Sequence, residues 1–346
     1  MKITDIKIKH ISVPLRTPFK TALRTVNSVE DTIVEVYTDT GNIGFGEAPP
    51  TGVITGDTTG AIIGAIEDHI KKSIIGMSID NFEELMLKLN NCIVKNTSAK
   101  AAVDIALYDL YGQLYNAPLY KLLGGYRKEI ITDITISVND LEEMAKDSLD
   151  AIKRGYTTLK IKVGKDSAKD MERMKAIRKA VGYDVKLRID ANQGWKPKEA
   201  VRILDKMYNE GLQIEFAEQP VAAHDIDGLK FVTDNVSIPV LADESVFSPM
   251  DALNILMKTG GIYNALKICS LAEMYGVECM IGCMLEAKVS VTAAVHLACA
   301  KSIITKIDLD GPVLCSEDPI TGGAVFNEYK ISLTEDSGLG IKSITY

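Results

Sequence analysis

The feature that most constrains the fold of this chain is the regular alternation of strand-like and helix-like segments after Gly125. Short runs rich in β-branched residues, such as TTLKIKV and VKLRIDA, alternate with amphipathic stretches such as LEEMAKDSLDAIKRG and PKEAVRILDKMYNEG. Strands joined through a helix run parallel, because each crossover returns the chain to the same end of the sheet. Repetition of this unit over residues 126–319 predicts an α/β fold with a TIM-like barrel rather than an open doubly wound sheet. No GxGxxG or GxxxxGK[ST] motif follows any of these strands, so the sequence does not support a nucleotide site.

The first part of the chain has a different pattern. Residues 1 to about 50 alternate apolar and polar positions, which predicts a small antiparallel sheet. From about 58 to 125 the apolar residues recur at helical spacing, so the segment 1–125 reads as an α+β domain. Short strand-like pieces at about 320–346 are expected to return to this domain. The 346 residues suffice for one large core and a smaller one.

Composition excludes several classes of function. The formal net charge is −8, and no dense run of Lys and Arg interleaves with aromatic residues, so nucleic acid is not expected as a partner. No window approaches about 18 uncharged apolar residues, so we expect no membrane association and a cytoplasmic protein. The six cysteines lack CxxC spacing and the four histidines lack HxH or HxxxH spacing, which disfavours disulfides and zinc.

An acidic residue stands where three successive predicted strands end. Asp190 lies in RIDANQGW, Glu218 in FAEQP and Asp243 in LADES, with separations of 28 and 25 residues. In a barrel, the carboxyl ends of the strands meet at one mouth, which is where barrel enzymes carry out their chemistry. Three converging carboxylates repel one another unless a cation lies among them, and oxygen ligands suit Mg²⁺. The alternative is that each acid caps a helix or lies in a loop.

Two lysines precede this series by one more unit. Lys160 and Lys162 share a face of their strand, because alternate residues of a strand point the same way. Solvent could cover that face. If it points into the barrel mouth, the two ammonium groups depress each other's pKa, so that one can be neutral and act as a base. A neutral lysine beside a bound cation can remove the proton α to a carboxylate, while the ion stabilises the enediolate.

Taken together, these motifs match a known family. KIK at 160–162, DANQGW from 190, EQP from 218, ADES from 242, TGG from 259 and DLDGP from 308 resemble the enolase superfamily, in its muconate-lactonising subgroup, and most closely its dipeptide epimerases. The resemblance covers almost the whole chain. It implies a (β/α)₇β barrel with an N-terminal capping domain, and Mg²⁺ bound by the three acids.

The resemblance also assigns roles to individual residues. It implies that Lys162 is the acid/base and that Lys160 contacts the substrate carboxylate. It further implies that Asp308 and Asp310 receive the free ammonium group of a dipeptide, that Arg24 faces the second side chain, and that Thr135 and Cys283 line the substrate site. Simpler explanations stay open: a solvated strand end for the aspartate pair, a surface position for Arg24, and core packing for Thr135 and Cys283.

The implied activity is a Mg²⁺-dependent dipeptide epimerase, an isomerase that inverts the Cα of the second residue by 1,1-proton transfer through an enediolate. The rivals are o-succinylbenzoate synthesis or cycloisomerisation on the same scaffold, and a non-catalytic dipeptide-binding protein. The DLD pair favours the epimerase, since the rival substrates have no ammonium group. Association into a homo-oligomer is open, and the sequence does not indicate which dipeptide is preferred.

The match fails at one point. The family's epimerases carry a second lysine on the sixth barrel strand, but only 36 residues separate Asp243 from Cys279, where two units would take roughly 50 at the spacing of the other units. Lys258, just before Thr259, matches a different family position and is not assigned the role. Three explanations are open: a stretch missing from the printed sequence, a real deletion that abolishes epimerisation, or a rearranged strand in which Lys258 substitutes. We favour the first, because a barrel without a central strand would expose unpaired edges.

Overall fold

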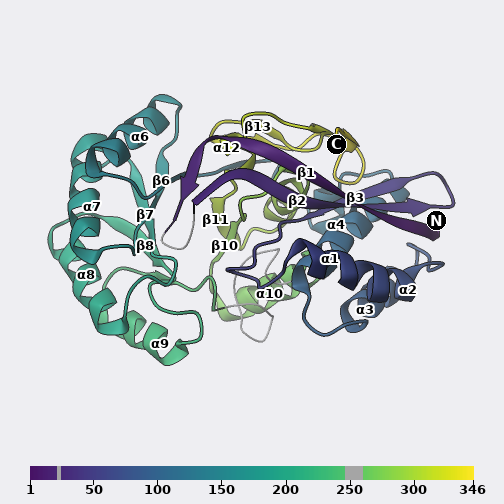
Figure 1. Ribbon diagram of the computed structural model, residues 1–346, viewed down its shortest axis with the longest axis horizontal. Coiled ribbons are helices and arrows are strands. Elements are labelled where there is room, and N and C mark those ends of the chain that lie inside the picture. The colour runs from purple at the N-terminus through teal and green to yellow at the C-terminus, as the bar shows by residue number, and fades with distance from the viewer. Residues whose placement is uncertain (22–24, 246–259) are drawn as a thin grey trace. The chain divides into compact units, whose positions relative to one another are not determined.

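The computed structural model describes residues 1–21, 25–245 and 260–346, which form two compact units (Figure 1). Unit 1 contains residues 1–16, 28–131 and 260–346, and unit 2 contains residues 17–21, 25–27 and 132–245. Residues 17–21 and 25–27, from the first two strands, thus share a unit with the early barrel strands. The division into a domain at 1–125 with a return segment and a barrel at 126–319 stays a prediction.

The N-terminal part of unit 1 is a three-stranded sheet packed on helices, as the alternation pattern predicted. The strands are β1 (Ile3–Lys20), β2 (Thr25–Thr38) and β3 (Ile43–Ala48), and the helical segments are α1 (Thr59–Ala65), η1 (Ile66–Ile70), α2 (Lys71–Ile74), α3 (Phe82–Asn91), α4 (Thr97–Leu114) and α5 (Leu119–Leu123). Helix α4 lies directly against β3. A Cβ atom at Gly46 would come within 1.8 Å of the Ala102 carbonyl oxygen, so glycine is required for this close approach.

The C-terminal part of unit 1 contains two parallel strands and several short antiparallel ones. Its elements are β4 (Glu129–Ile131), α10 (Ile262–Tyr275), β10 (Cys279–Gly282), α11 (Lys288–Ala300), β11 (Ile304–Asp308), α12 (Gly311–Leu314), β12 (Ile320–Gly322), β13 (Val325–Asn327), β14 (Lys330–Ser332) and β15 (Ile341–Ile344). Strands β10 and β11 pair in parallel. The last strands pair with one another and with β4 rather than with β1–β3.

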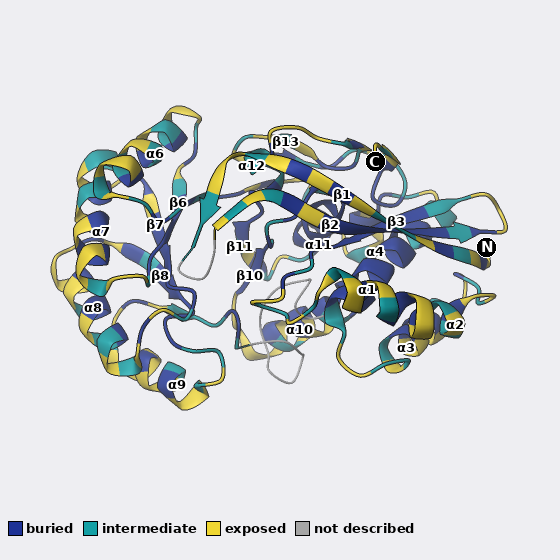
Figure 2. Cartoon of the chain, in the orientation of Figure 1, coloured by how far each residue is buried: buried dark blue, intermediate teal, exposed yellow. Residues whose placement is uncertain are grey.

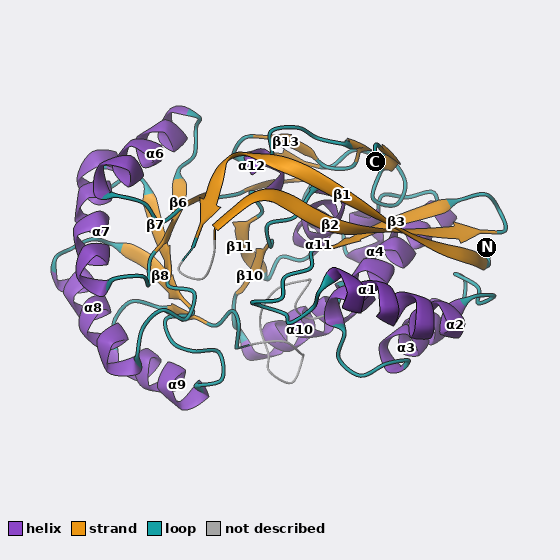
Figure 3. Cartoon of the chain, in the orientation of Figure 1, coloured by secondary structure: helices purple, strands orange, loops and turns teal. Residues whose placement is uncertain are grey.

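Unit 2 is a five-stranded parallel sheet in the order β5-β6-β7-β8-β9, with its helices along one side (Figure 3). Its elements are β5 (Ile134–Ile136), α6 (Leu141–Lys153), β6 (Thr158–Lys162), α7 (Ser167–Val181), β7 (Lys186–Asp190), α8 (Pro197–Asn209), β8 (Ile214–Glu218), α9 (Ile226–Asn235) and β9 (Val240–Leu241). The strands are largely buried, whereas the helices expose their outer faces (Figure 2). The strand and helix alternation predicted for this segment is confirmed.

The described strands stop on either side of the point where the sequence departs from the family pattern. One parallel sheet ends at β9 and the next parallel pair begins at β10. The expected sixth strand falls between them and would lie within residues 246–259, outside the described residues. In the part of the chain that the structure describes, no helix is long and apolar enough to cross a membrane.

Candidate active site

Three predicted site residues lie side by side at the carboxyl ends of adjacent strands. Lys162 on β6 is in register with Asp190 on β7, which is in register with Glu218 on β8. Glu218 pairs in turn with Leu241 on β9, and Asp243 follows two residues later. The equal lengths of the strand–helix units therefore place the lysine and the acids at one edge of the sheet, as their spacing predicted. Lys160, Lys162 and the three acids are each at most 8% exposed.

Both lysines pair with these acids. Lys162 Nζ donates a hydrogen bond to Asp190 Oδ2 at 2.5 Å. Lys160 Nζ lies 3.3 Å from Asp190 Oδ2 and 2.8 Å from Glu218 Oε2, so it bridges two carboxylates. The lysine face thus points to the acids and not to solvent, and the ion pairs themselves were not expected from the sequence.

Burial and neighbouring charges shift the pKa values of two of the acids, Asp190 and Glu218. Burial would raise the pKa of Asp190, but the charges of Lys162 and Lys160 outweigh it and hold that pKa below its usual value. Burial raises the pKa of Glu218 to about 8, with Lys160 opposing the rise and the charges of Asp190 and Asp243 adding to it. Glu218 therefore lies within electrostatic range of both Asp190 and Asp243.

The motif residues around the acids hold the loops in place. Gln219 Oε1 accepts hydrogen bonds from the backbone nitrogens of Asp243, at 2.8 Å, and Ser245, at 3.2 Å, so the end of β8 fixes the end of β9. Asn192 donates its backbone N–H to Asp190 Oδ1 at 2.8 Å and its side chain to Glu244 Oε1 at 3.2 Å. The motifs EQP and DANQGW did not by themselves indicate these roles.

The donor set fits Mg²⁺, although the acids do not yet surround a single point. Across residues 1–21, 25–245 and 260–346, no three His, Cys, Asp or Glu side chains are gathered closely enough to hold a metal ion as they stand. The ammonium group of Lys160 lies between two of the three acids. Buried carboxylate oxygens on neighbouring strands are the ligands that Mg²⁺ prefers. Asp190, Glu218 and Asp243 are therefore the residues that would hold the ion.

A second layer of buried charge, not predicted from the sequence, lies two residues before the ends of these strands. Arg188 on β7 is in register with Lys160 and is 6% exposed. Its Nη1 donates to Asp133 Oδ2 and its Nε to Glu215 Oε2, both at 2.6 Å. Arginine two residues before a predicted metal ligand, on the same face, was the available sequence signal.

The remaining predicted substrate residues fall into separate groups. In unit 2, Thr135 on β5 is in register with Lys160. In unit 1, Cys283 Sγ lies 3.9 Å from Asp310 Oδ1, and burial together with the charges of Asp310 and Asp308 raises the pKa of this thiol well above its usual value. Strand β11 ends at Asp308, so the two aspartates do not share a strand, yet both affect the same thiol.

Two residues discussed from the sequence cannot be placed. Arg24 and Lys258 lie outside the described residues. Their roles, and the question of the second lysine, therefore stay predictions.

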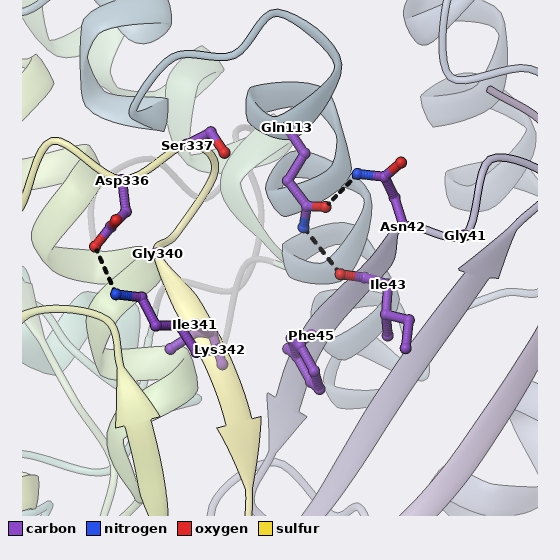
Figure 4. Close-up of a pocket in the computed structure, with 10 residues that line it drawn as sticks. All are labelled: Gly41, Asn42, Ile43, Phe45, Gln113, Asp336, Ser337, Gly340, Ile341 and Lys342. Atoms are coloured by element: carbon purple, nitrogen blue, oxygen red, sulfur yellow. Dashed lines mark hydrogen bonds and ion pairs between the residues drawn. The ribbon is translucent and has the colours of Figure 1, made fainter.

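Unit 1 also contains a polar pocket of about 400 Å³ (Figure 4). Its polar side chains pair with one another: Gln113 binds Asn42 and the Ile43 carbonyl, and Asp336 lies 3.6 Å from Lys342. Because these groups already satisfy one another, we assign no chemistry to this pocket.

Comparison with known proteins identifies the class to which this site belongs. Residues 3–124 match the mandelate racemase / muconate lactonizing enzyme N-terminal domain, and residues 143–343 match the enolase C-terminal domain-like family. The chain belongs to this family of the enolase superfamily. It therefore has an N-terminal α+β domain and a C-terminal barrel-type domain, as predicted.

Individual relatives of known activity show which members of the family this chain is similar to. The chain is 65% identical to an L-Ala-D/L-Glu epimerase of Clostridium acetobutylicum over 99% of both chains. It is similar to the substrate-liganded structure of the L-Ala-D/L-Glu epimerase from Bacillus subtilis, with a TM-score of 0.98, 48% identity and complete coverage of both chains. It is also similar to a dipeptide epimerase from Enterococcus faecalis complexed with Mg and L-Leu-L-Tyr, with a TM-score of 0.95, 42% identity and coverage of 99% and 100%.

Proposed function

We propose that this protein is a Mg²⁺-dependent dipeptide epimerase that inverts the Cα of the second residue by 1,1-proton transfer through an enediolate. It is an isomerase of the racemase and epimerase class, in keeping with its relatives at 65% and 49% identity. The observation that carries the proposal is the buried row of Lys162, Asp190 and Glu218 at the ends of three adjacent parallel strands. The row places the proposed base directly beside two of the proposed cation ligands.

The row suits removal of a proton next to a carboxylate. Bound Mg²⁺ would supply the positive charge that stabilises the enediolate. Carboxylates that hold a cation no longer need the ammonium groups, so Lys162 can then accept the Cα proton on one face of the enediolate, while inversion needs a second donor on the opposite face. Lys160, beside it on the same face, would contact the substrate carboxylate and keep it oriented.

The positively charged ammonium group at the other end of the substrate requires acidic side chains to bind it. We assign the free ammonium group of the dipeptide to Asp308 and Asp310, which are 5% and 4% exposed. Charge complementarity supports this role, since a buried acid pair is stabilised by a cation. Cys283 and Thr135 are proposed to line the site, and Arg24 to face the second side chain.

Deuterium incorporation tests the proposal directly. The protein is incubated in D₂O with Mg²⁺ and a panel of L,L-dipeptides, including L-Ala-L-Glu, and the Cα of the second residue is followed by mass spectrometry and NMR. Incorporation together with formation of the L,D-epimer is expected, and Lys162→Met should abolish both. The absence of incorporation across a broad panel would contradict the proposal.

One observation favours a second candidate, proton exchange without inversion. The alignment with the 65% identical relative spans 356 positions, whereas this chain has 346 residues, so at least ten positions have no counterpart here. The second lysine belongs to the region where the sequence is shortened. If that shortening is real, Lys162 alone would exchange the proton on one face and return it to the same face.

Two measurements separate the candidates. An intact mass of 37.7 kDa for the natural protein would support a real deletion, and a heavier chain would restore the complete epimerase. In D₂O, incorporation into the L,L-dipeptide without any L,D product would identify one-sided exchange. If deuterated product and L,D-epimer formed at equal rates, one-sided exchange would be excluded.

A further inference from the structure

The end of β1 is hydrogen-bonded to the segment that follows the barrel strand β5. The last residue of β1, Lys20, donates its backbone N–H to Ser137 Oγ at 3.1 Å, and its carbonyl accepts the N–H of Val138 at 3.1 Å. Its ammonium group donates to Asn139 Oδ1 at 2.6 Å. Three bonds therefore join one residue of the hairpin to the segment directly after β5.

The same segment is joined to the end of the next strand. The Asn139 carbonyl accepts a hydrogen bond from Arg173 Nε at 3.0 Å, and Arg173 Nη1 donates to Asp170 Oδ1 at 2.9 Å. The other oxygen of Asp170 accepts the backbone N–H of Gly164 at 2.8 Å. Gly164 follows Lys162 by two residues, so the series ends beside the proposed base.

Burial makes this series more than a surface contact. Asp170 is fully buried and Arg173 is 8% exposed. Burial raises the pKa of Asp170, while the Gly164 N–H and Arg173 oppose that rise. Removing a partner would leave a buried charge unpaired, which costs far more than an exposed bond is worth.

The end of the series has little freedom to adapt. Gly164 has φ of +91°, and a Cβ atom there would lie 2.2 Å from the Ala191 carbonyl oxygen. Ala191 directly follows Asp190. Gly164 is thus packed tightly between the end of the strand that carries Lys162 and the end of the strand that carries Asp190.

We propose that Lys20, Asn139, Arg173 and Asp170 form a positioning relay, which sets the end of β1 relative to the strand end that carries Lys162. The relay makes substrate binding at the hairpin side depend on the same contacts that orient the base. Its role in catalysis rests on the proposed function. None of the four residues is assigned to contact the substrate.

The relay is tested first without substrate, by hydrogen exchange and mass spectrometry. Lys20→Met, Asn139→Ala and Arg173→Met should each speed exchange of the Gly164 amide, with Arg173→Met the strongest. Lys153→Met is the matched control, since Lys153 pairs with Asp150 at 2.8 Å on the exposed side of α6 in the same unit. Unchanged exchange at Gly164 in Lys20→Met and Asn139→Ala would overturn the relay, whether or not the protein is an epimerase.

Kinetics then separate positioning from simple stability. Lys20→Met should raise KM about three- to tenfold and change kcat less than about twofold, as expected for loss of one charged hydrogen bond. Lys20→Arg should restore KM. In a double-mutant cycle, Lys20→Met combined with Arg173→Met should add little to Arg173→Met alone, because both interrupt one series. Fully additive effects of the two substitutions on KM would contradict the proposal, and so would a fall in Tm with KM unchanged. An inactive wild type would contradict only the proposed function.

Discussion

Two buried acid clusters in this molecule are stabilised in opposite ways. In unit 2, Asp190 and Glu218 contact the ammonium groups of two lysines. In unit 1, Asp31 on β2, Glu47 on β3 and Glu286 before α11 are each at most 2% exposed, and burial together with the charge of Glu47 raises the pKa of both Asp31 and Glu286. Lysines compensate charge in the first cluster, whereas in the second at least one carboxyl must hold a proton.

The cluster of Asp31, Glu47 and Glu286 serves to attach a helix. Asp31 Oδ2 and Glu47 Oε1 both accept the N–H of Ala287, at 2.9 and 3.0 Å, and Glu47 Oε2 accepts from Ser290 N at 2.8 Å. These are the unpaired donors of the first turn of α11, where negative charge is favourable. Burial, the charge of Glu47 and a hydrogen bond to Glu47 raise the pKa of Asp31 well above its usual value.

The difference shows what makes a buried acid reactive. An acid cluster balanced by protons and helix donors holds two elements together. An acid row balanced by lysines can exchange those lysines for another cation, and the exchange releases an amine.

The largest effect is expected at the base. Lys162→Met should lower kcat for deuterium incorporation by about 10³-fold or more, in the range of general acid–base catalysis. Isotope incorporation at Cα measures it directly, and Lys153→Met should leave the rate unchanged. If Lys162→Met kept more than a tenth of the wild-type rate, the base would have to be another group.

Removing the bridging lysine should be costly for stability. Lys160→Met leaves Glu218 and Asp190 buried with less positive charge, so the free energy of unfolding should fall by about 3–5 kcal/mol without Mg²⁺. Added Mg²⁺ should restore more stability to this variant than it gives to the wild type, because the ion can replace the lost ammonium charge. Urea unfolding with EDTA and with MgCl₂ provides the comparison. If Mg²⁺ raised the free energy of unfolding equally in both proteins, the ion would not replace the charge of Lys160.

Much of this row could be predicted from the sequence. Alternation within TTLKIKV placed both lysines on one face, and the nearly equal unit lengths placed Lys162, Asp190 and Glu218 in register. These features depend on local periodicity and on chain length, which the sequence contains. The lysine–acid contacts were not predictable, because they depend on side-chain conformations chosen to balance buried charge.

Other features could not be predicted because they depend on tertiary structure. Strict alternation places Glu215 on the opposite face from Glu218, yet it reaches Arg188 because the β7–β8 register shifts between Leu187 and Ile189. Asp31 and Glu286 are 255 residues apart and belong to no common motif, so only the folded chain brings them together.

The proton-balanced cluster predicts a pH effect on stability. Burial, with the charge of Glu47, raises the pKa of Glu286 to about 7. A raised pKa means that the folded state binds the proton more tightly, so this contribution is full below the unfolded pKa and is lost as pH rises through about 7. Glu286→Gln keeps an oxygen for the Met284 N–H and cannot ionise. It should therefore exceed the wild type by about 2–3 kcal/mol at pH 8 and match it at pH 4.

Thermal unfolding between pH 4 and pH 8 measures this effect. A variant that is less stable than the wild type at pH 8 would mean that the charged form of Glu286 is the stabilising one. The cluster would then resemble the lysine row instead of contrasting with it.

The smallest effect is expected at an exposed acid with the opposite shift. Hydrogen bonds from Lys121 and Lys128 lower the pKa of Glu335 to about 2. A lowered pKa gives a contribution that is present above the unfolded pKa and is lost as pH falls toward about 2. Glu335→Gln should thus lower Tm slightly at pH 7, less at pH 4 and hardly at all in 1 M salt, because water and ions screen exposed pairs. The same Glu-to-Gln change would then raise stability at Glu286 and lower it at Glu335 above pH 7. A change in the same direction at both positions would mean that a general property of the substitution, and not local charge balance, decides the result.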